Sequence, residues 1–242
     1  MVQALSRRDR LRAATAQEIR QTARRLLVDH GAEAVSLRAI AREMGMTAPA
    51  LYRYFGSHEE LIRNVVADVF TELTGSLRAA IASAAADGGD LTAQVIAACW
   101  EFRRWSLEHK REFGLLFGSP LPGVNVEKDE ITSECGQEFG NTFFALILEL
   151  WRTRPFPVPP DTDIDAGLRA QLERYRDGLG TLGAGLPLGL LLIFLRCWTR
   201  LYGTLSLEVF GHLGFALDDP EPMFELMLID TAPLIGLQYP PR

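Results

Sequence analysis

Apolar side chains recur every three or four residues in two successive segments near the start of the chain, 15–30 and 37–44. This spacing places them on one face of an α-helix. We expect the first helix to begin at Thr15, which forms a capping box with Glu18, and to end at Gly31. Residues 1–14 contain four arginines and few apolar side chains, so we expect a basic arm before that helix.

The second helix is followed by a turn and then by a very short third helix. Gly45 can end a helix in the left-handed conformation, and Thr47 can cap the next one, in which Pro49 occupies the tolerated first turn. Gly56 ends this segment. A helix this short is marginal alone, so its neighbours must hold it in place.

A long helix is predicted after Gly56. Ser57 and Glu60 have the S-x-x-E spacing of a capping box, and helical spacing of apolar residues continues until the D-G-G-D sequence at 87–90. Further helical patterns cover the segments 91–109, 110–118, 131–151, 161–178, 187–210 and 219–237. The sequence shows no strand-like alternation, so the expected fold class is all-α.

One apolar segment invites comparison with membrane helices. The seventeen residues from Leu179 to Leu195 carry no charge, which is near the lower limit for a bilayer span. They include four glycines and a proline, and Arg196 and Arg200 follow directly. A core or interface helix of a soluble protein explains this composition better than a membrane helix, so we expect no membrane partner.

Charge is unevenly distributed along the 242 residues. Residues 1–60 have ten arginines against seven acidic residues, a net charge of +3, whereas the remainder has fifteen basic and twenty-four acidic residues, or −9. A basic front on an acidic body indicates where a polyanion can bind. The three cysteines are unpaired in spacing and no secretory signal is visible, which favours a cytoplasmic location.

Residues typical of catalysis or metal binding are scattered. The four histidines and three cysteines lack metal-ligand spacing, and the sequence contains no phosphate loop or nucleophile–base pairing. We therefore expect no enzyme, no cofactor and no metal.

The short helix after the turn predicts a surface that could read DNA. If Leu51 and Phe55 face the core, the 100° rotation per residue places Pro49 and Arg53 on the opposite side. Small side chains there allow close approach to base edges, and Arg53 can reach a guanine or a phosphate. An ordinary helical subdomain with solvated arginines would show the same spacing, so this pattern alone leaves both interpretations open.

The stretch S-L-R-A-I-A-R-E-M-G-M-T-A-P-A-L-Y-R-Y-F-G-S-H-E-E-L at 36–61 resembles the DNA-binding domain of the TetR family of bacterial transcriptional repressors. The resemblance covers about residues 12–64. It implies an all-α homodimer with an N-terminal three-helix helix-turn-helix domain and a larger helical domain that binds a ligand and dimerises. By resemblance, the residues that bind DNA are Arg38, Thr47, Ala48, Pro49, Ala50, Tyr52, Arg53, Tyr54 and His58.

The sequence departs from the family pattern at two positions. Many members have a phosphate-binding lysine where this chain has His58, and an imidazole is mostly uncharged near neutral pH, so we expect operator binding to strengthen as the pH falls. The segments 100–118 and 197–211 resemble the WHG-type C-terminal domain of some members. Trp198 and Gly203 fit its Trp-His-Gly pattern, but Tyr202 replaces the histidine, so no ligand role is carried over from that residue.

Aromatic and aliphatic residues of the C-terminal half provide candidates for a ligand pocket and for a dimer interface. The pocket candidates are Phe102, Phe117, Phe143, Ile147, Trp198 and Tyr202. Each of them could equally be an ordinary core residue. The apolar faces of the last two helices predict the dimer interface, through Leu205, Val209, Phe224 and Met227.

Together these patterns divide the chain into a basic arm at 1–14, a helix-turn-helix DNA-binding domain at 15–60 and a ligand-binding and dimerisation domain at 61–242. We expect a repressor that binds a palindromic operator in double-stranded DNA as a homodimer and is released by a small, largely apolar effector. A DNA-binding architectural protein without ligand control is the alternative. Binding that only salt weakens, with no effect of a small molecule, would favour that alternative.

Overall fold

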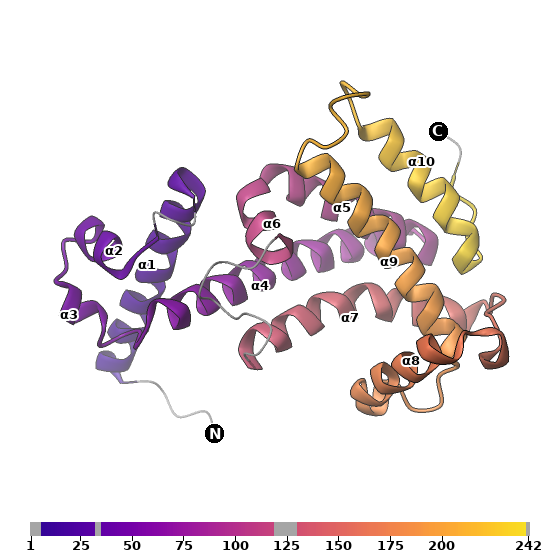
Figure 1. Cartoon of the computed structure of the whole chain (residues 1–242), viewed down its shortest axis with the longest axis horizontal. Helices are drawn as coiled ribbons and strands as arrows, with labels where there is room; N and C mark the ends of the chain where they lie inside the picture. The colour runs from indigo at the N-terminus through magenta and orange to yellow at the C-terminus, as the bar shows by residue number, and fades with distance from the viewer. Residues whose placement is uncertain (1–5, 32–34, 119–129, 241–242) are drawn as a thin grey trace. The chain divides into compact units, whose positions relative to one another are not determined.

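The computed structural model describes residues 6–31, 35–118 and 130–240, and the regular elements among these residues are all helical (Figure 1). This confirms the all-α prediction. The α-helices are α1 (Arg7–His30), α2 (Leu37–Glu43), α3 (Ala48–Leu51), α4 (His58–Ala86), α5 (Leu91–Glu108), α6 (Lys110–Phe117), α7 (Glu130–Thr153), α8 (Ala166–Gly178), α9 (Leu188–Val209) and α10 (Glu221–Thr231). Short 3-10 helices are η3 (Asp161–Asp163), η4 (Gly180–Leu182) and η5 (Ala232–Ile235).

The chain forms two compact units. The first comprises Met1–Gly75 with Glu108–Gly140, and the second comprises Ser76–Leu107 with Asn141–Arg242. Helices α4 and α7 therefore contribute residues to both units. The functional boundary expected near residue 61 stays a prediction.

The first helix begins earlier than the sequence suggested. Ser6 caps α1 by accepting a hydrogen bond from the Asp9 backbone N at 3.2 Å, so the helix starts at Arg7 rather than at Thr15. Thr15 consequently lies inside the helix, where its hydroxyl donates to the Leu11 carbonyl at 3.1 Å. The predicted capping box of Thr15 is wrong, and residues 7–14 extend the first helix. Residues 1–5 of the expected arm lie outside the described residues.

Side-chain caps define the starts of α2 and α4, and the predicted capping box of Ser57 and Glu60 is confirmed, whereas the cap expected from Thr47 at α3 is wrong because its side chain makes no capping bond among the described residues. The Ser36 hydroxyl accepts from the Ala39 N at 3.1 Å at the start of α2. At the start of α4, the Ser57 hydroxyl accepts from the Glu60 N at 3.0 Å, and the Glu60 carboxylate accepts from the Gly56 N at 2.7 Å. These reciprocal bonds satisfy amides that a helix start would otherwise leave unpaired.

The core of the first unit is apolar, and charged pairs join its helices. Helix α1 packs against α2 and α6, and α2 packs against α3. Arg24 of α1 donates to Glu72 of α4 at 2.5 Å and to Glu112 of α6 at 3.1 Å. The hydrogen bond to Glu72 is the main cause that raises the pKa of Arg24. Arg20 pairs with Asp68 at 2.5 Å.

The second unit has a predominantly aromatic interior. Helix α9 packs against α8 and α10, and Figure 1 shows α9 and α10 joined by a long connection. Phe144 of α7 meets Phe194 of α9 edge to face, with ring centroids 5.1 Å apart. Trp100 of α5 meets Phe224 of α10 in the same way, also at 5.1 Å. Such edge-to-face pairs add to the stabilisation that burial provides.

Helix α9 is the one described helix that is long and apolar enough to cross a membrane by length and composition alone, with a mean hydropathy of 1.3 in its most apolar window. Within the unit, 44% of that window is buried. Its buried residues include Leu190, Leu191 and Leu205. Helix α9 therefore buries part of its apolar surface within the second unit, where it packs against α8, α10 and η5.

Candidate DNA-reading surface and ligand cavity

Helices α2 and α3 are joined by a tight turn that fixes the position of α3. Gly45 adopts a left-handed conformation with φ 65°, and the Met46 N donates to the Ala41 carbonyl at 2.8 Å. Thr47 follows in an extended conformation and, among the described residues, makes no side-chain capping bond. Because Thr47 is exposed, its hydroxyl is accessible to an incoming phosphate oxygen.

Helix α3 buries one side and exposes the other, in agreement with the helical spacing. Leu51 and Phe55 are buried, whereas Pro49 and Arg53 are exposed. Tyr52 is 54% exposed, which is unusual for a large aromatic side chain. Ala48 and Ala50 are partly exposed beside it, as is Tyr54, and Arg38 is exposed on the first turn of α2.

The α-helical part of α3 is shorter than expected, because it ends at Leu51 and residues 52–54 form turns. Arg12 of α1 supports this end of the segment by donating from Nη2 to the Arg53 carbonyl at 3.2 Å. This bond was not foreseen from the sequence. It could not be, since it depends on the early start of α1 and on tertiary packing.

His58 begins α4 at the edge of the same surface. Its imidazole is half-buried, and its Nε2 atom is buried and has no hydrogen-bond partner among the described residues. A phosphate contact through Nε2 would therefore require the imidazole ring to turn.

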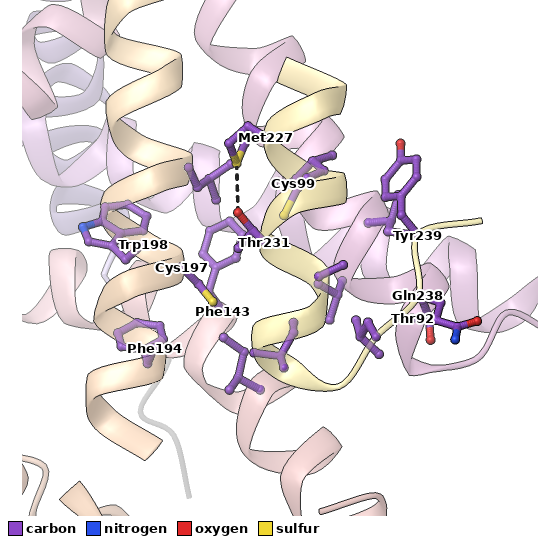
Figure 2. A pocket seen from close by; sticks show the side chains of 18 residues that line it. Thr92, Cys99, Phe143, Phe194, Cys197, Trp198, Met227, Thr231, Gln238 and Tyr239 are labelled. Atoms are coloured by element: carbon purple, nitrogen blue, oxygen red, sulfur yellow. Dashed lines mark hydrogen bonds between the residues drawn. The ribbon is translucent and has the colours of Figure 1, made fainter. Parts of the chain in front are cut away.

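The second unit contains an apolar cavity of about 70 Å³, enclosed by α5, α7, α9, α10, η5 and the segment after η5 (Figure 2). None of the described residues that line it is charged. The lining consists of Thr92, Val95, Ile96, Cys99, Phe143, Ile147, Phe194, Cys197, Trp198, Leu201, Met227, Leu228, Thr231, Ala232, Ile235, Leu237, Gln238 and Tyr239.

The few polar groups of the cavity are not evenly placed. Figure 2 shows Thr92, Gln238 and Tyr239 at one end and Trp198 with Phe194 at the other. The three hydroxyls already have partners within the chain. Thr92 donates to the Asp90 carboxylate at 3.1 Å, Tyr239 accepts from the Trp100 Nε1 at 3.2 Å, and Thr231 donates to the Met227 sulfur at 3.6 Å. A ligand would therefore meet an almost entirely apolar surface.

Three of the six pocket candidates line this cavity, namely Phe143, Ile147 and Trp198. Phe102 lies behind them, fully buried, with its ring centroid 6.1 Å from that of Trp198. Tyr202 also stacks on this indole, at 5.7 Å between centroids. These two residues support the cavity wall without lining it.

Phe117 lies in a different aromatic cluster. Its ring is 5.8 Å from Phe70 and 5.6 Å from Phe139, all within the first unit. The sequence-based set therefore combined residues from two separate clusters, because helical spacing does not reveal which helices meet.

Two cavity thiols were not singled out as pocket residues by the sequence. Burial raises the pKa of Cys99 to about 12 and that of Cys197 to about 11, and the neighbouring Cys197 adds to the shift at Cys99. Both shifts indicate that the cavity is a poor environment for negative charge. The thiols act as soft apolar surface at neutral pH.

The four residues assigned to the dimer interface are all buried within one chain: Leu205, Val209, Phe224 and Met227. In the single chain they are core residues. Other apolar side chains of α9, of Phe210 directly after it and of α10 remain between 43% and 47% exposed. These residues are Leu207, Phe210, Met223, Leu226 and Ile229.

Comparison with known proteins agrees with a helix-turn-helix regulator. Residues 19–65 match the family described as bacterial regulatory proteins, tetR family. Residues 95–231 match the tetracyclin repressor-like C-terminal domain. The HTH-type transcriptional regulators Rv1816 of Mycobacterium tuberculosis and Mb1846 of Mycobacterium bovis are each 31% identical to the chain over 212 residues, which is 86% of this chain and 86% of each relative.

Solved structures share the fold. The regulatory protein SCO4313 is 31% identical, with a TM-score of 0.69 over 93% of this chain and 98% of that one. The TetR family regulator PfmR from Thermus thermophilus is 15% identical, with a TM-score of 0.53 over 93% of this chain and all of that one, and supports the fold alone. The molecule is a DNA-binding transcriptional regulator rather than an enzyme. The chain belongs to the TetR family.

Proposed function

We propose that this regulator is a cytoplasmic repressor that binds a palindromic operator as a homodimer and is released by a small, uncharged, largely apolar molecule. One observation carries the proposal: the chain pairs an exposed helix-turn-helix surface with a separate cavity lined by uncharged residues. An architectural DNA-binding protein would need only the first of these features.

On the operator, we assign base contacts to Arg38 and to the segment 48–53. The exposed Pro49 and the partly exposed Ala48 and Ala50 suit contact with thymine methyl groups, and Arg53 suits a guanine or a phosphate. Thr47, Tyr52 and Tyr54 would hold the flanking phosphates through their hydroxyls. His58 is the remaining candidate for a phosphate.

Dimerisation places two copies of this surface on the two halves of a palindrome. Adjacent half-sites in the same groove are about 34–36 Å apart in B-DNA, so a two-fold dimer can read both at once. The exposed apolar faces of α9 and α10 suit an isologous contact, in which the same residues of both copies meet.

The chemistry of the cavity selects for a neutral effector. An unpaired carboxylate or ammonium would lose its hydration without a charged partner among the lining residues, which is strongly unfavourable. The volume of about 70 Å³ is about half of the 150 Å³ that accommodates benzene in an engineered protein cavity. The effector would therefore insert a small apolar group or widen the cavity as it binds.

The test begins with selection of genomic DNA fragments by the full-length protein, followed by fluorescence anisotropy with the selected operator. 1-Hexanol and hexanoate then serve as matched probes, because they share a chain length and differ in charge. We expect specific binding that 1-hexanol weakens and that hexanoate leaves unchanged at the same ionic strength. Non-specific binding that responds only to salt would favour the architectural alternative.

A further inference from the structure

The arginines of helix α1 fall into two groups that differ in whether they have acidic partners. In the second half of the helix, Arg20, Arg24 and Arg25 each form an ion pair with a carboxylate of α2, α4 or α6. Four exposed arginines of the first two turns form no ion pair within the described ranges: Arg7, Arg8, Arg10 and Arg12. The start of α1 therefore presents positive charge that the described chain does not pair.

A side-chain cap gives this basic segment a fixed helical conformation. The Ser6 hydroxyl accepts from the Asp9 N at 3.2 Å and donates to the Asp9 carboxylate at 2.6 Å. Asp9 is the one acidic residue between residues 6 and 17, and its carboxylate takes part in this cap. Arginine and alanine, which make up most of residues 7–14, favour the helix. The arginines are thus held in position before a partner arrives, which lowers the entropic cost of binding.

Arg8 and Arg12 continue the buried stripe of α1 beyond the core. The rotation of 100° per residue places them within about 60° of Ile19 and Ala23 around the helix axis. Ile19 and Ala23 are buried, whereas Arg8 and Arg12 are exposed. The face of α1 that packs into the first unit therefore extends past the core as a basic surface.

The basic end of this face lies beside the DNA-reading segment. Figure 1 shows the beginning of α1 next to α3, and the Arg12 Nη2 atom donates to the Arg53 carbonyl at 3.2 Å. A guanidinium has several N–H donors, and this bond uses one of them. Arg8 lies about one helical turn before Arg12 on the same face. Two exposed guanidinium groups therefore border the segment that we assign to base contacts.

We propose that Arg8 and Arg12 bind phosphates of the operator backbone beside the base pairs that α3 reads. The proposal rests on the proposed operator binding and extends its contact surface. Arg12 has two roles, because its bond to the Arg53 carbonyl also holds residues 52–54, which form turns. Both arginines precede the segment 19–65 that matches the family, so the contact is inferred from this chain alone.

The chemistry of the two arginines suits the DNA backbone. Guanidinium groups pair with phosphate oxygens through charge-assisted hydrogen bonds. A duplex carries one negative charge per about 1.7 Å of its axis, so two cations about 6 Å apart along a helix can both meet phosphates whatever the sequence. Arg12 is bonded to Arg53 of the reading segment, so the polyanion that meets Arg12 is the one that α3 reads.

The salt dependence of DNA binding tests these contacts one at a time. Each phosphate that a cation neutralises contributes about −0.9 to the slope of log association constant against log salt concentration. We expect Arg8→Gln to make this slope about 0.9 less steep. It should weaken binding to the selected operator and to an unrelated duplex by the same factor, about fivefold or less. Anisotropy titrations of the full chain over a series of KCl concentrations measure both quantities. An unchanged slope overturns the Arg8 contact.

Arg25→Gln is the matched control. Arg25 lies on the same helix with its side chain 54% exposed, and the substitution removes the same charge. It should leave the slope unchanged, which separates a local contact from the general effect of net charge. Glutamine favours a helix about as well as arginine, so both variants should keep the wild-type circular dichroism. An equal change of slope in Arg25→Gln and Arg8→Gln overturns the proposal.

Arg12→Gln should reveal both roles of Arg12. We expect the same change of slope as for Arg8→Gln. In addition, discrimination between the operator and the unrelated duplex should fall, because residues 52–54 lose the bond to the Arg53 carbonyl. The double variant Arg8→Gln with Arg12→Gln should make the slope about 1.8 less steep. Loss of discrimination with the wild-type slope would make Arg12 a positioning residue alone and overturn its phosphate contact.

Ethylation interference on the selected operator identifies the phosphates concerned. Ethylation removes the charge of a phosphate, so DNA that is ethylated at a contacted phosphate is depleted from the bound fraction. We expect Arg8→Gln to lose interference at particular phosphates of each half-site, and Arg25→Gln to retain the wild-type pattern. Identical patterns for Arg8→Gln and the wild type contradict the contact.

These outcomes separate the contacts from the proposed function. If the protein selects a specific operator and both variants keep the wild-type slope, the two contacts fail while the repressor stands. If no specific operator is selected, the proposed function fails. The slopes on the unrelated duplex still test Arg8 and Arg12 in that case, because phosphate contacts do not depend on sequence.

Discussion

Each of the two units of this regulator is stabilised internally by a different kind of interaction. In the first unit, charged side chains join the helices: Arg24 connects α1 to α4 and α6, and Arg20 makes a second pair with α4. In the second unit, aromatic rings fill the interior and uncharged residues surround a cavity. The first unit should therefore respond to salt and to charge substitutions, and the second to changes in volume.

The second unit departs from this pattern at one charge cluster. In the described part of the second unit, Arg103 pairs with Glu208 and Glu221; the Arg103 and Glu208 side chains are only 11% and 4% exposed, whereas Glu221 is 44% exposed. The pKa of Arg103 is raised overall, although desolvation, which is the largest single influence, acts in the opposite direction. The carboxylates thus compensate the cost of burying the guanidinium. A cluster of this kind fixes where α5, α9 and α10 meet.

The largest expected contrast concerns the cysteines. Cys135 of the first unit is partly exposed, whereas Cys99 and Cys197 of the second are free thiols with a pKa of about 12 and about 11. Only the thiolate reacts, so we expect alkylation of Cys99 at pH 8 to be at least about a thousandfold slower than that of a typical exposed thiol. Mass spectrometry after timed exposure to iodoacetamide measures each site.

The same shifts make stability depend on alkaline pH. An unfolded thiol ionises near pH 8.5, and the folded Cys99 near pH 12. Because the folded pKa is raised, this contribution to the free energy of unfolding is complete below about pH 8.5 and is lost as the pH rises toward 12. Cys99→Ala should flatten the decline. Rapid alkylation of Cys99 in the folded protein at pH 8 would contradict the burial of this thiol.

The next largest effect tests the buried charge cluster. Arg103→Met would leave Glu208 buried without its cation, and we expect the free energy of unfolding to fall by about 3–5 kcal/mol. Urea denaturation measures this change. As a matched control, Arg104→Met alters the neighbouring arginine, whose side chain is 52% exposed and paired within α5, and should cost less than about 1 kcal/mol.

A double variant distinguishes loss of charge compensation from loss of packing. Arg103→Met with Glu208→Gln removes both charges of the buried pair, so much of the stability lost in Arg103→Met should return. If the double variant is as unstable as Arg103→Met alone, the guanidinium contributes through its contacts with Trp100 and Phe224 rather than through charge.

The reading surface of the first unit should respond differently. Arg53 is exposed, so Arg53→Ala should leave the free energy of unfolding unchanged and weaken operator binding by about 1–3 kcal/mol. The bond from Arg12 survives this change, because it goes to the Arg53 carbonyl. Anisotropy titrations on the selected operator measure the loss. Arg174→Ala, an exposed arginine of α8 in the second unit, should have no such effect.

The extent of sequence-based prediction also differs between the units. Much of the α2–α3 region was predictable, because its information is local: Ser57 caps α4, Gly45 makes the turn, and Leu51 lies two positions from the exposed Pro49. The cap expected from Thr47 was wrong, since a hydroxyl at a helix start can also remain exposed. The start of α1 was missed because Ser6 is an equally good cap in an arginine-rich segment that has no apolar stripe.

The cavity and the exposed apolar face could not be obtained in this way. Helix α10 carries two apolar stripes, and only packing decides that Phe224 faces inward and Leu226 outward. The segment after η5 lines the cavity through Leu237 and Tyr239, yet it has no periodic pattern that would mark it. Long-range packing determines both features, which is why Phe117 was grouped with residues of another cluster.

The smallest expected effect concerns His58, whose imidazole lies at the start of α4. If the ring holds an operator phosphate, protonation adds an exposed ion pair, which contributes about 1 kcal/mol or less. Operator affinity should therefore rise modestly between pH 8 and pH 6, and His58→Gln should abolish that rise. His30→Gln on the last turn of α1 is a control for an exposed histidine elsewhere in the first unit. Because Nε2 is buried and has no hydrogen-bond partner in the described part of the chain, a contact through it requires the ring to turn on binding. An affinity that is independent of pH in the wild type would remove His58 from the DNA-binding set.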